Sequence, residues 1–298
     1  MYLQPPFLKK KDKVAIIATA KNFEIQELAP ALEILKSWGV EVLLGKNVYH
    51  KFNQFAGTDE ERLEDLQWAL DHKEIKVIFC ARGGYGSSRI IDQVNLAQVK
   101  KNPKWLVGFS DVTVIHGLLQ KAGIQSIHGI MPVLFSKPGS EESIQKLKDI
   151  LFGKKSDYKI AAHFLDHTGR TEAMITGGNL SILCSIIGTK TDIDTRDKIL
   201  FMEDVGENLY RIDRMMIQMK RAGKLDRIKG LVVGHFSDME DNKISFGKTA
   251  YEIIYDAVKE YNYPICFGFP AGHESENLPL VFGENYSLQV TASGTKIK

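Results

Sequence analysis

The stretch NPKWLVGFSDVTVIHGLL, from Asn102 to Leu119, decides the fold class because it joins an apolar strand directly to a helix. Trp105 to Phe109 is predicted to form the strand, and Ser110 lies at the junction. A strand that feeds straight into a helix is typical of α/β sheets with parallel strands.

The same alternation runs through the first 150 residues. Leucines recur at helical spacing after the first strand, and Gly39 ends that helix. A second helix opens with a capping box, Thr58 with Glu61 three residues later. A glycine-rich turn, RGGYG, is expected to open a further helix rich in Ile and Val. The predicted strands are residues 14–18, 40–44, 76–80 and 105–109.

The second half has fewer helices, and its strands lie closer together along the chain. The predicted elements are a helix after Gly177–Asn179, a strand at 199–204, a helix at 208–222, a strand at 231–234, a helix at 249–261, a strand at 265–269 and a hairpin turning at Ser293-Gly294.

We therefore expect an α/β protein with an N-terminal, mostly parallel sheet domain and a smaller, β-richer C-terminal domain. The expected domains are residues 1–152 and 172–298, with a linker at 153–171 where the periodicity lapses.

Composition excludes several classes of protein. The 298 residues carry a formal charge of +2. Residues 1–150 hold 20 basic and 17 acidic side chains, and residues 151–298 hold 19 and 20, so neither half is basic enough to favour nucleic acid. The apolar run at 14–18 is too short for a signal peptide or a membrane span. Three widely spaced cysteines form neither a disulfide framework nor a zinc pattern. A cytoplasmic, metal-independent protein is expected.

Two loops of the first half could carry chemistry. Ser110, on a sharp strand-to-helix turn, suits a nucleophile, although Ser110 or Asp111 could merely cap the helix. The amides of RGGYG, residues 82–86, could stabilise an oxyanion or cradle phosphate, or the glycines could only form a tight turn.

Two segments of the second half add titratable groups. In ILFMEDVGENLYRIDR, Glu203 or the competing Asp204 ends an apolar strand, where a partner must compensate a buried carboxylate. In FGFPAGHESENLPL, His273 lies in a loop just after a strand. His163 and His167 have the i, i+4 spacing of a metal pair, but no third ligand is evident, so no metal site is expected.

Taken together, these segments resemble the LD-carboxypeptidase family, the serine peptidases that include murein tetrapeptide carboxypeptidase and the microcin self-immunity hydrolase. The resemblance covers nearly the whole chain and rests on five segments in order. They are ARGGYGSSRII, NPKWLVGFSDVTVIHGLL, TGGNLSILCSIIGT, ILFMEDVGENLYRIDRMMIQMKRAG and FGFPAGHESENLPL.

The resemblance implies a role for each matching residue. Ser110 would be the nucleophile, Glu203 the acid and His273 the histidine of a catalytic triad. The oxyanion hole would be built from backbone amides, of which the matching positions are Asp111 and a glycine of RGGYG, Gly83 or Gly84. The family also implies a homodimer and no metal or organic cofactor.

The implied reaction removes the terminal D-alanine from cytosolic murein tetrapeptides by cleaving an L,D-peptide bond. The substrate ends in a carboxylate, for which Arg82 is a candidate partner on proximity alone; a structural ion pair is the alternative. No nucleic acid or membrane partner is expected.

Two other functions remain open. One is a hydrolase of peptidyl or aminoacyl adenylates of the microcin-immunity type. Such enzymes tend to carry a longer loop before the acid residue, whereas residues 189–198 form a short stretch without an aromatic residue. The other is a peptide-binding module without catalysis. Two departures from the family pattern, at residues 128–132 and 278–281, bear on substrate preference rather than on the triad.

Overall fold

A computed structural model describes residues 2–298, which fold as two compact units. The first unit comprises the chain up to Lys154 together with Leu278–Gly283, and the second comprises Lys155–Asn277 and Glu284–Lys298. No helix among the described residues has the length and apolar character needed to cross a membrane.

The first unit is built on a six-stranded sheet in the order β11-β5-β4-β3-β1-β2. Five strands run parallel, and only β11 is antiparallel to its neighbour β5. The strands are β1 (Lys13–Ile17), β2 (Glu41–Leu44), β3 (Ile75–Cys80), β4 (Trp105–Gly108), β5 (Ser126–His128) and β11 (Leu280–Phe282). β1, β3 and β4 are apolar and buried almost throughout, because helices cover both of their faces.

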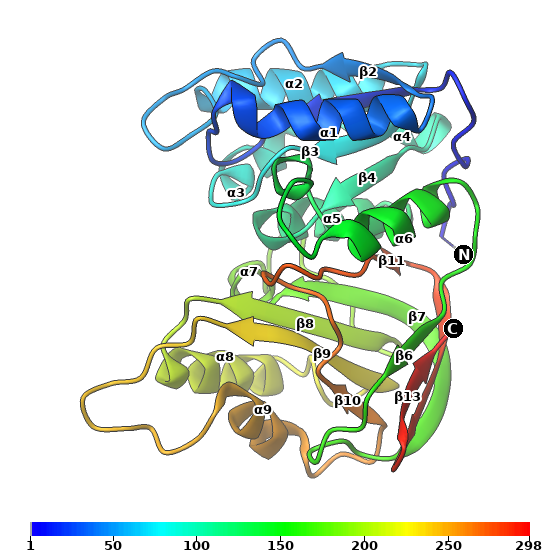
Figure 1. Ribbon diagram of the computed structural model, residues 1–298. Coiled ribbons are helices and arrows are strands. Elements are labelled where there is room, and N and C mark those ends of the chain that lie inside the picture. The colour runs from blue at the N-terminus through cyan, green and yellow to red at the C-terminus, as the bar shows by residue number, and fades with distance from the viewer. Residues whose placement is uncertain (1) are drawn as a thin grey trace. The chain divides into compact units, whose positions relative to one another are not determined.

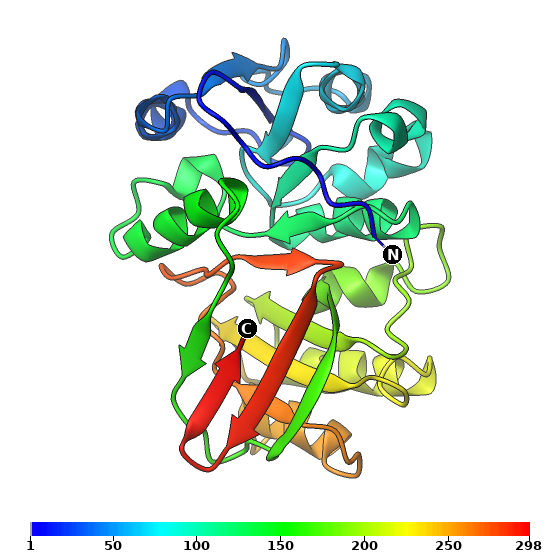
Figure 2. The ribbon, with the colours of Figure 1, turned by 90° about the vertical axis from the view of Figure 1, so that its right-hand side faces the viewer.

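Helices lie on both faces of this sheet, α1 and α6 on one and α2 and α5 on the other (Figure 2). Leucines of α1 and α6 pack with Val14, Ile16 and Phe79 in one core. The predicted capping box of α2 is confirmed, since Thr58 and Glu61 cap each other's backbone. The helices are α1 (Ile25–Ser37), α2 (Asp59–Asp71), α3 (Ser87–Ile90), α4 (Ala97–Lys101), α5 (Thr113–Lys121) and α6 (Glu141–Leu151).

The second unit contains a seven-stranded mixed sheet in the order β10-β9-β8-β7-β12-β13-β6 (Figure 1). β7 to β10 are parallel, and β12, β13 and β6 continue the sheet antiparallel. The strands are β6 (Tyr158–Ile160), β7 (Gly169–Asn179), β8 (Ile199–Val205), β9 (Gly230–Ser237), β10 (Ile265–Phe267), β12 (Asn285–Thr291) and β13 (Gly294–Ile297).

Three helices accompany this sheet, and α8 packs against both of the others. They are α7 (Leu180–Ser185), α8 (Leu209–Arg221) and α9 (Ala250–Val258). Asn179 caps α7 by accepting the amide N–H of Ile182, and Thr249 caps α9 in a capping box. The predicted fold class is therefore confirmed, with a smaller and β-richer second unit.

The structure differs from the sequence prediction in several places. The segment after RGGYG is not one helix. The short helix α3 is followed by the 3₁₀ turn η1 (Ile91–Gln93), and a second helix, α4, begins at Ala97, whose amide N–H donates to Asn95 Oδ1. The expected linker contains β6 and the start of β7. The final hairpin turns one residue earlier, because Thr291 and Gly294 already pair.

A strand near the C-terminus also returns to the first unit. β11 adds to the edge of the first sheet beside β5, so Leu280 pairs with His128. A domain boundary placed once along the chain could not include this return. It follows from edge pairing, which is a long-range interaction with no local sequence signal.

Candidate active site

Ser110 occupies a strained turn between β4 and a helix in the first unit. Its φ is +62°, a left-handed conformation that is uncommon for a residue other than glycine. The 3₁₀ turn η2 (Ser110–Val112) begins there and runs into α5. Strain of this kind persists only where the surroundings enforce it, and it concentrates at functional sites. The turn has the strand-to-helix form that exposes a nucleophile.

The glycine-rich loop lies beside this serine. A Cβ at Gly83 would stand only 3.1 Å from Ser110 Cβ and 3.3 Å from Ser110 Oγ. At Gly84, φ is +113° and a Cβ would come within 2.7 Å of Lys21 Cβ. Both glycines are therefore required by close approach, and the loop backbone lies against the serine without an intervening side chain.

Asp111 turns its side chain inward beneath the same loop. It is fully buried, and its Oδ2 accepts the amide N–H of Ser87 at 2.8 Å. Burial raises the pKa of the Asp111 carboxyl, while hydrogen bonds from Ser87 and the charge of Arg62 oppose that rise. Asp111 thus ties the serine turn to the end of the glycine-rich loop.

In the second unit, Glu203 and His273 form a hydrogen-bonded pair. Glu203 stands near the carboxyl end of β8, and His273 lies in the loop that follows β10. His273 Nδ1 is 2.8 Å from Glu203 Oε2. The glutamate side chain is fully buried and the imidazole is 19% exposed, so the carboxylate binds the imidazole from within the core.

Asp204, the competing acid, serves a different purpose. Its carboxylate accepts hydrogen bonds from Asn179 Nδ2, Ser181 N and Val205 N, all at 2.9 Å. Burial, followed by the charge of Glu203, raises the pKa of Asp204 to about 7. The alternation of side chains along β8 therefore sends one carboxylate to the imidazole and the other to the start of α7.

Close backbone packing holds the histidine loop. Gly272 has φ +140°, and a Cβ there would lie 3.1 Å from His235 Cβ and 3.2 Å from Glu203 Oε2. Its N–H donates to Asn277 Oδ1 at 3.1 Å. His235 borders the same loop, and burial lowers the pKa of its imidazole.

Arg82 has a carboxylate partner on its own unit. Its Nη1 lies 3.2 Å from Glu27 Oε1, and about a third of the arginine side chain is exposed. The structure thus contains a structural ion pair between Arg82 and Glu27, which is the alternative to a role for Arg82 in substrate binding.

His116 and the three cysteines are buried side chains with structural surroundings. His116 Nε2 lies 2.9 Å from the Gly108 carbonyl oxygen, which can only accept, so Nε2 carries the proton and Nδ1 accepts from Ser126 Oγ. Burial lowers the pKa of His116 to about 4. All three cysteines are free and buried, and burial raises the pKa of each thiol to about 12, so none is a reactive thiolate.

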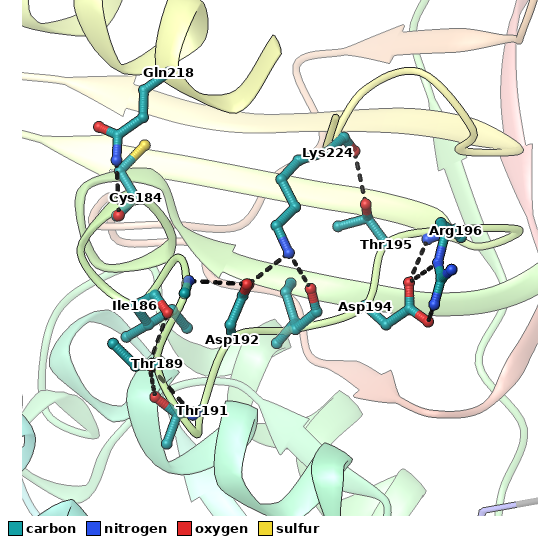
Figure 3. Close-up of polar contacts among 12 residues, drawn as sticks. Cys184, Ile186, Thr189, Thr191, Asp192, Asp194, Thr195, Arg196, Gln218 and Lys224 are labelled. Atoms are coloured by element: carbon teal, nitrogen blue, oxygen red, sulfur yellow. Dashed lines mark hydrogen bonds and ion pairs between the residues drawn. The ribbon is translucent and has the colours of Figure 1, made fainter. Parts of the chain in front are cut away.

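The segment that precedes the acid strand β8 is fastened by side chains (Figure 3). Lys224 Nζ donates to Asp192 Oδ1 at 2.5 Å and to the Ile193 carbonyl at 2.7 Å, and Thr195 Oγ1 donates to the Lys224 carbonyl at 2.7 Å. Arg196 and Asp194 form a two-bond ion pair beside them. These contacts hold the segment against the residues that follow α8.

Within residues 2–298, no three side chains from His, Cys, Asp or Glu are grouped to hold a metal ion. A cavity of about 700 Å³ opens near α9, lined in part by Phe164, Phe236 and Tyr251, but it includes neither Glu203 nor His273.

Sequence reasoning did not single out Thr19, Arg62 or Ser87, although Ser87 bonds Asp111 and Arg62 bonds the Thr19 and Gly86 carbonyls. Arg62 lies on α2, four residues before the buried Leu66, and is itself fully buried. An arginine at a core position of an amphipathic helix was the available signal.

The fold and these side-chain groups define a two-unit α/β protein, with a serine on a strained turn in one unit and a carboxylate–imidazole pair in the other. Family models match both parts of the chain: the LD-carboxypeptidase N-terminal domain over residues 14–129 and the LD-carboxypeptidase C-terminal domain over residues 172–288.

Individual proteins of known name are also similar to this chain over nearly its whole length. The probable murein peptide carboxypeptidase of Bacillus subtilis (strain 168) is 33% identical, over 99% of this chain and 93% of its own. The crystal structure of muramoyltetrapeptide carboxypeptidase from Oxalobacter formigenes has a TM-score of 0.88 at 28% identity, covering 96% of this chain and 97% of its own.

A structure of MccF in complex with glutamyl sulfamoyl guanosine has the same TM-score, 0.88, at 18% identity, covering 100% of this chain and 98% of its own. That similarity concerns the fold. The chain belongs to the LD-carboxypeptidase family, peptidase S66.

Proposed function

We propose that this protein is a serine LD-carboxypeptidase that removes the terminal D-alanine from murein tetrapeptides. The observation that carries the proposal is the Glu203–His273 hydrogen bond of 2.8 Å in a family whose relatives include a murein peptide carboxypeptidase. The strained Ser110 beside the glycine-rich loop supports it further.

In this proposal, Glu203 holds His273 in the tautomer with the proton on Nδ1, and neutral Nε2 accepts the proton of Ser110 Oγ. The serine oxygen bonds to the carbonyl carbon on the L side of the scissile bond. The C–N bond then breaks, and the imidazolium returns the proton to the departing amine of D-alanine. Water attacks the acyl-enzyme with the same histidine as base, which releases the tripeptide.

The negative oxygen of the tetrahedral intermediate needs N–H donors that are already in place. We assign the amide of Asp111 and those of Gly83 and Gly84 to this role. Support comes from the approach of Gly83 to Ser110, which leaves the backbone rather than a side chain next to the reacting oxygen. Loss of one such donor typically costs about 10²- to 10³-fold in rate.

A murein peptide is the proposed substrate rather than an aminoacyl adenylate. Residues 189–198 contain no aromatic side chain that could stack on a nucleobase. Asp192 and Thr195 of this segment are bonded to Lys224 (Figure 3), so rearranging it around a base would break the contacts that hold it. The name of the Oxalobacter relative supports the same choice.

The resemblance to the family supports the remaining parts of the proposal. The protein would act in the cytoplasm during cell-wall recycling, as a homodimer and without a metal or organic cofactor. Arg82 remains a proposed partner of the substrate carboxylate, in competition with its ion pair to Glu27.

One parallel assay tests the substrate. The protein is incubated with L-Ala-γ-D-Glu-meso-diaminopimelate-D-Ala and, separately, with an aminoacyl sulfamoyl adenylate, and both products are followed by mass spectrometry. The proposal predicts release of D-alanine from the peptide and slower or no release of amine from the adenylate. Faster cleavage of the adenylate would favour the microcin-immunity reaction, and cleavage of neither would favour a binding module.

A further inference from the structure

A buried polar cluster lies beneath the serine turn and the glycine-rich loop. It consists of Thr19, Arg62, Ser87 and Asp111, whose relative exposures are 0% in every case. Thr19 follows β1, Arg62 belongs to α2, Ser87 begins α3, and Asp111 follows the serine. The cluster therefore joins four separate segments of the first unit at one point.

Arg62 fastens two of these segments through their backbones. Its Nη1 donates to the Thr19 carbonyl at 2.7 Å and to the Gly86 carbonyl at 2.8 Å. Its Nη2 pairs with Asp59, which also binds Arg89. The planar guanidinium thus fixes the last glycine of RGGYG relative to the end of β1, which a single ammonium could not do with the same geometry.

Side chains complete the connection to the serine turn. Thr19 Oγ1 and Ser87 Oγ are 2.8 Å apart, and the Ser87 amide donates to Asp111 Oδ2 at 2.8 Å. The other carboxylate oxygen, Asp111 Oδ1, has no hydrogen-bond partner among the described residues. The Asp111 carboxylate therefore depends on the charge of Arg62 for part of its compensation.

Gly86 is adapted to this arrangement. Its φ is +152°, and a Cβ there would lie 2.6 Å from Arg62 Nη1 and 3.0 Å from Thr19 O. The glycine lets the loop backbone close over the guanidinium. This explains why the loop needs its last glycine although Gly86 does not approach Ser110 in the way Gly83 does.

We infer that Arg62 and Asp111 are positioning residues for the oxyanion hole. They fix the amide of Asp111 relative to the loop amides of Gly83 and Gly84, through the Arg62 bonds to the Thr19 and Gly86 carbonyls and the Asp111 bond to the Ser87 amide. This inference rests on the proposed function for the identity of the oxyanion-hole amides. Through Arg62, the helix α2 would help to position the oxyanion-hole amides without touching the substrate itself.

The test compares Arg62→Met and Arg62→Lys with Arg89→Met. Arg89 is a matched control because it shares the Asp59 ion pair and lies over the same Phe55 ring, yet its side chain does not bond the Thr19 or Gly86 carbonyl. Each variant is checked by circular dichroism and thermal melting. Two rates are measured: kcat and KM on the tetrapeptide, and the rate constant for phosphonylation of Ser110 by a fluorophosphonate, whose phosphoryl oxygen also occupies an oxyanion hole.

We expect Arg62→Met to lower kcat and the phosphonylation rate about 100-fold, with KM changed less than about threefold. Arg62→Lys, which keeps the charge but not the fork, should lose about tenfold, and Arg89→Met should stay within about threefold of wild type.

A folded Arg62→Met protein with wild-type kcat and phosphonylation rate would overturn the inference, as would equal losses in Arg89→Met. If Arg62→Met does not fold, Arg62→Lys provides the same comparison, and a wild-type rate there overturns it. A wild-type protein that is phosphonylated at Ser110 but releases no D-alanine would contradict the proposed substrate, while the phosphonylation rates would still decide the role of Arg62.

Discussion

The two units hold different kinds of candidate catalytic groups. In the first unit these groups depend on backbone: a left-handed Ser110, glycines that allow close approach, and amides fixed from below by buried side chains. In the second unit they are two side chains, Glu203 and His273, joined by one hydrogen bond. A backbone site is damaged by adding atoms, and a side-chain site by changing a single functional group.

The two sheets position their candidate catalytic groups in different ways. The parallel strands of the first unit are covered by helices on both faces, so the ends of β3 and β4 can present loops at one edge. In the second unit β7 lies between parallel β8 and antiparallel β12, and Glu203 stands near the end of a strand buried within the sheet. The carboxylate is thus positioned by a buried strand.

The largest effect should come from the side-chain pair. Glu203→Gln keeps the size of the group but presents either an amide N–H or a weaker acceptor to His273 Nδ1, so kcat should fall on the order of 10⁴-fold. Asp204→Asn is measured beside it. That variant should lower the melting temperature, because Asp204 accepts three hydrogen bonds, yet change kcat less than about tenfold. Equal losses of activity in both variants would mean that the acid has been assigned incorrectly.

A smaller loss should follow from adding one methyl group to the backbone site. Gly83→Ala would place a Cβ 3.1 Å from Ser110 Cβ, and we expect kcat to fall about 100-fold as the loop moves away. The control is Gly129→Ala, whose nearest neighbour would be Pro279 Cβ at 3.4 Å, an ordinary contact. Steady-state kinetics on both variants measure the difference, and full activity in Gly83→Ala would place the oxyanion-hole donors elsewhere.

The buried His116 should make the stability of the first unit depend on pH. Its pKa in the folded protein is about 4, below the ordinary value near 6.5, so between these values only the unfolded chain takes up the proton. Stability should therefore rise as pH rises from 4 to 6.5 and be lost as pH falls, by on the order of 3 kcal/mol from this group.

Denaturant unfolding at pH 4.5 and 7.5 measures this dependence. In His116→Gln the difference between the two pH values should shrink. An unchanged pH dependence in His116→Gln would show that other groups cause it.

The smallest effect concerns Arg82. If it binds the substrate carboxylate despite its ion pair with Glu27, Arg82→Ala should raise KM several-fold with little change in kcat. Glu27→Gln frees the arginine without removing it and should leave KM the same or lower. An unchanged KM in folded Arg82→Ala would leave the arginine with a structural role only.

Sequence reasoning predicted the parts of this molecule that depend on local patterns. The capping box of Thr58 and Glu61 follows directly from residue type and spacing. The strands β1, β3 and β4 are apolar runs because both of their faces are buried. The apolar pattern did not predict the break between α3 and α4. The Asn95 side chain accepts a hydrogen bond from the amide of Ala97, and this local bond starts a separate helix.

Long-range features could not be predicted in the same way. The return of β11 to the first sheet depends on edge pairing with β5, and the role of Arg62 depends on carbonyls at Thr19 and Gly86, far away in sequence. For the site, residue types and the family resemblance singled out Ser110, Glu203 and His273. The resemblance favours Glu203 over Asp204 as the acid, and in the structure Glu203 bonds His273 whereas Asp204 bonds the amide of Ser181.

The central claim is that Ser110 is the nucleophile of an LD-carboxypeptidase. It is tested most directly by D-alanine release from L-Ala-γ-D-Glu-meso-diaminopimelate-D-Ala, measured by mass spectrometry for the wild-type protein and for Ser110→Ala. We predict steady release by the wild-type protein and release at least about 10⁴-fold slower by a folded Ser110→Ala variant with an unchanged melting temperature. Release by Ser110→Ala at the wild-type rate would contradict the serine mechanism.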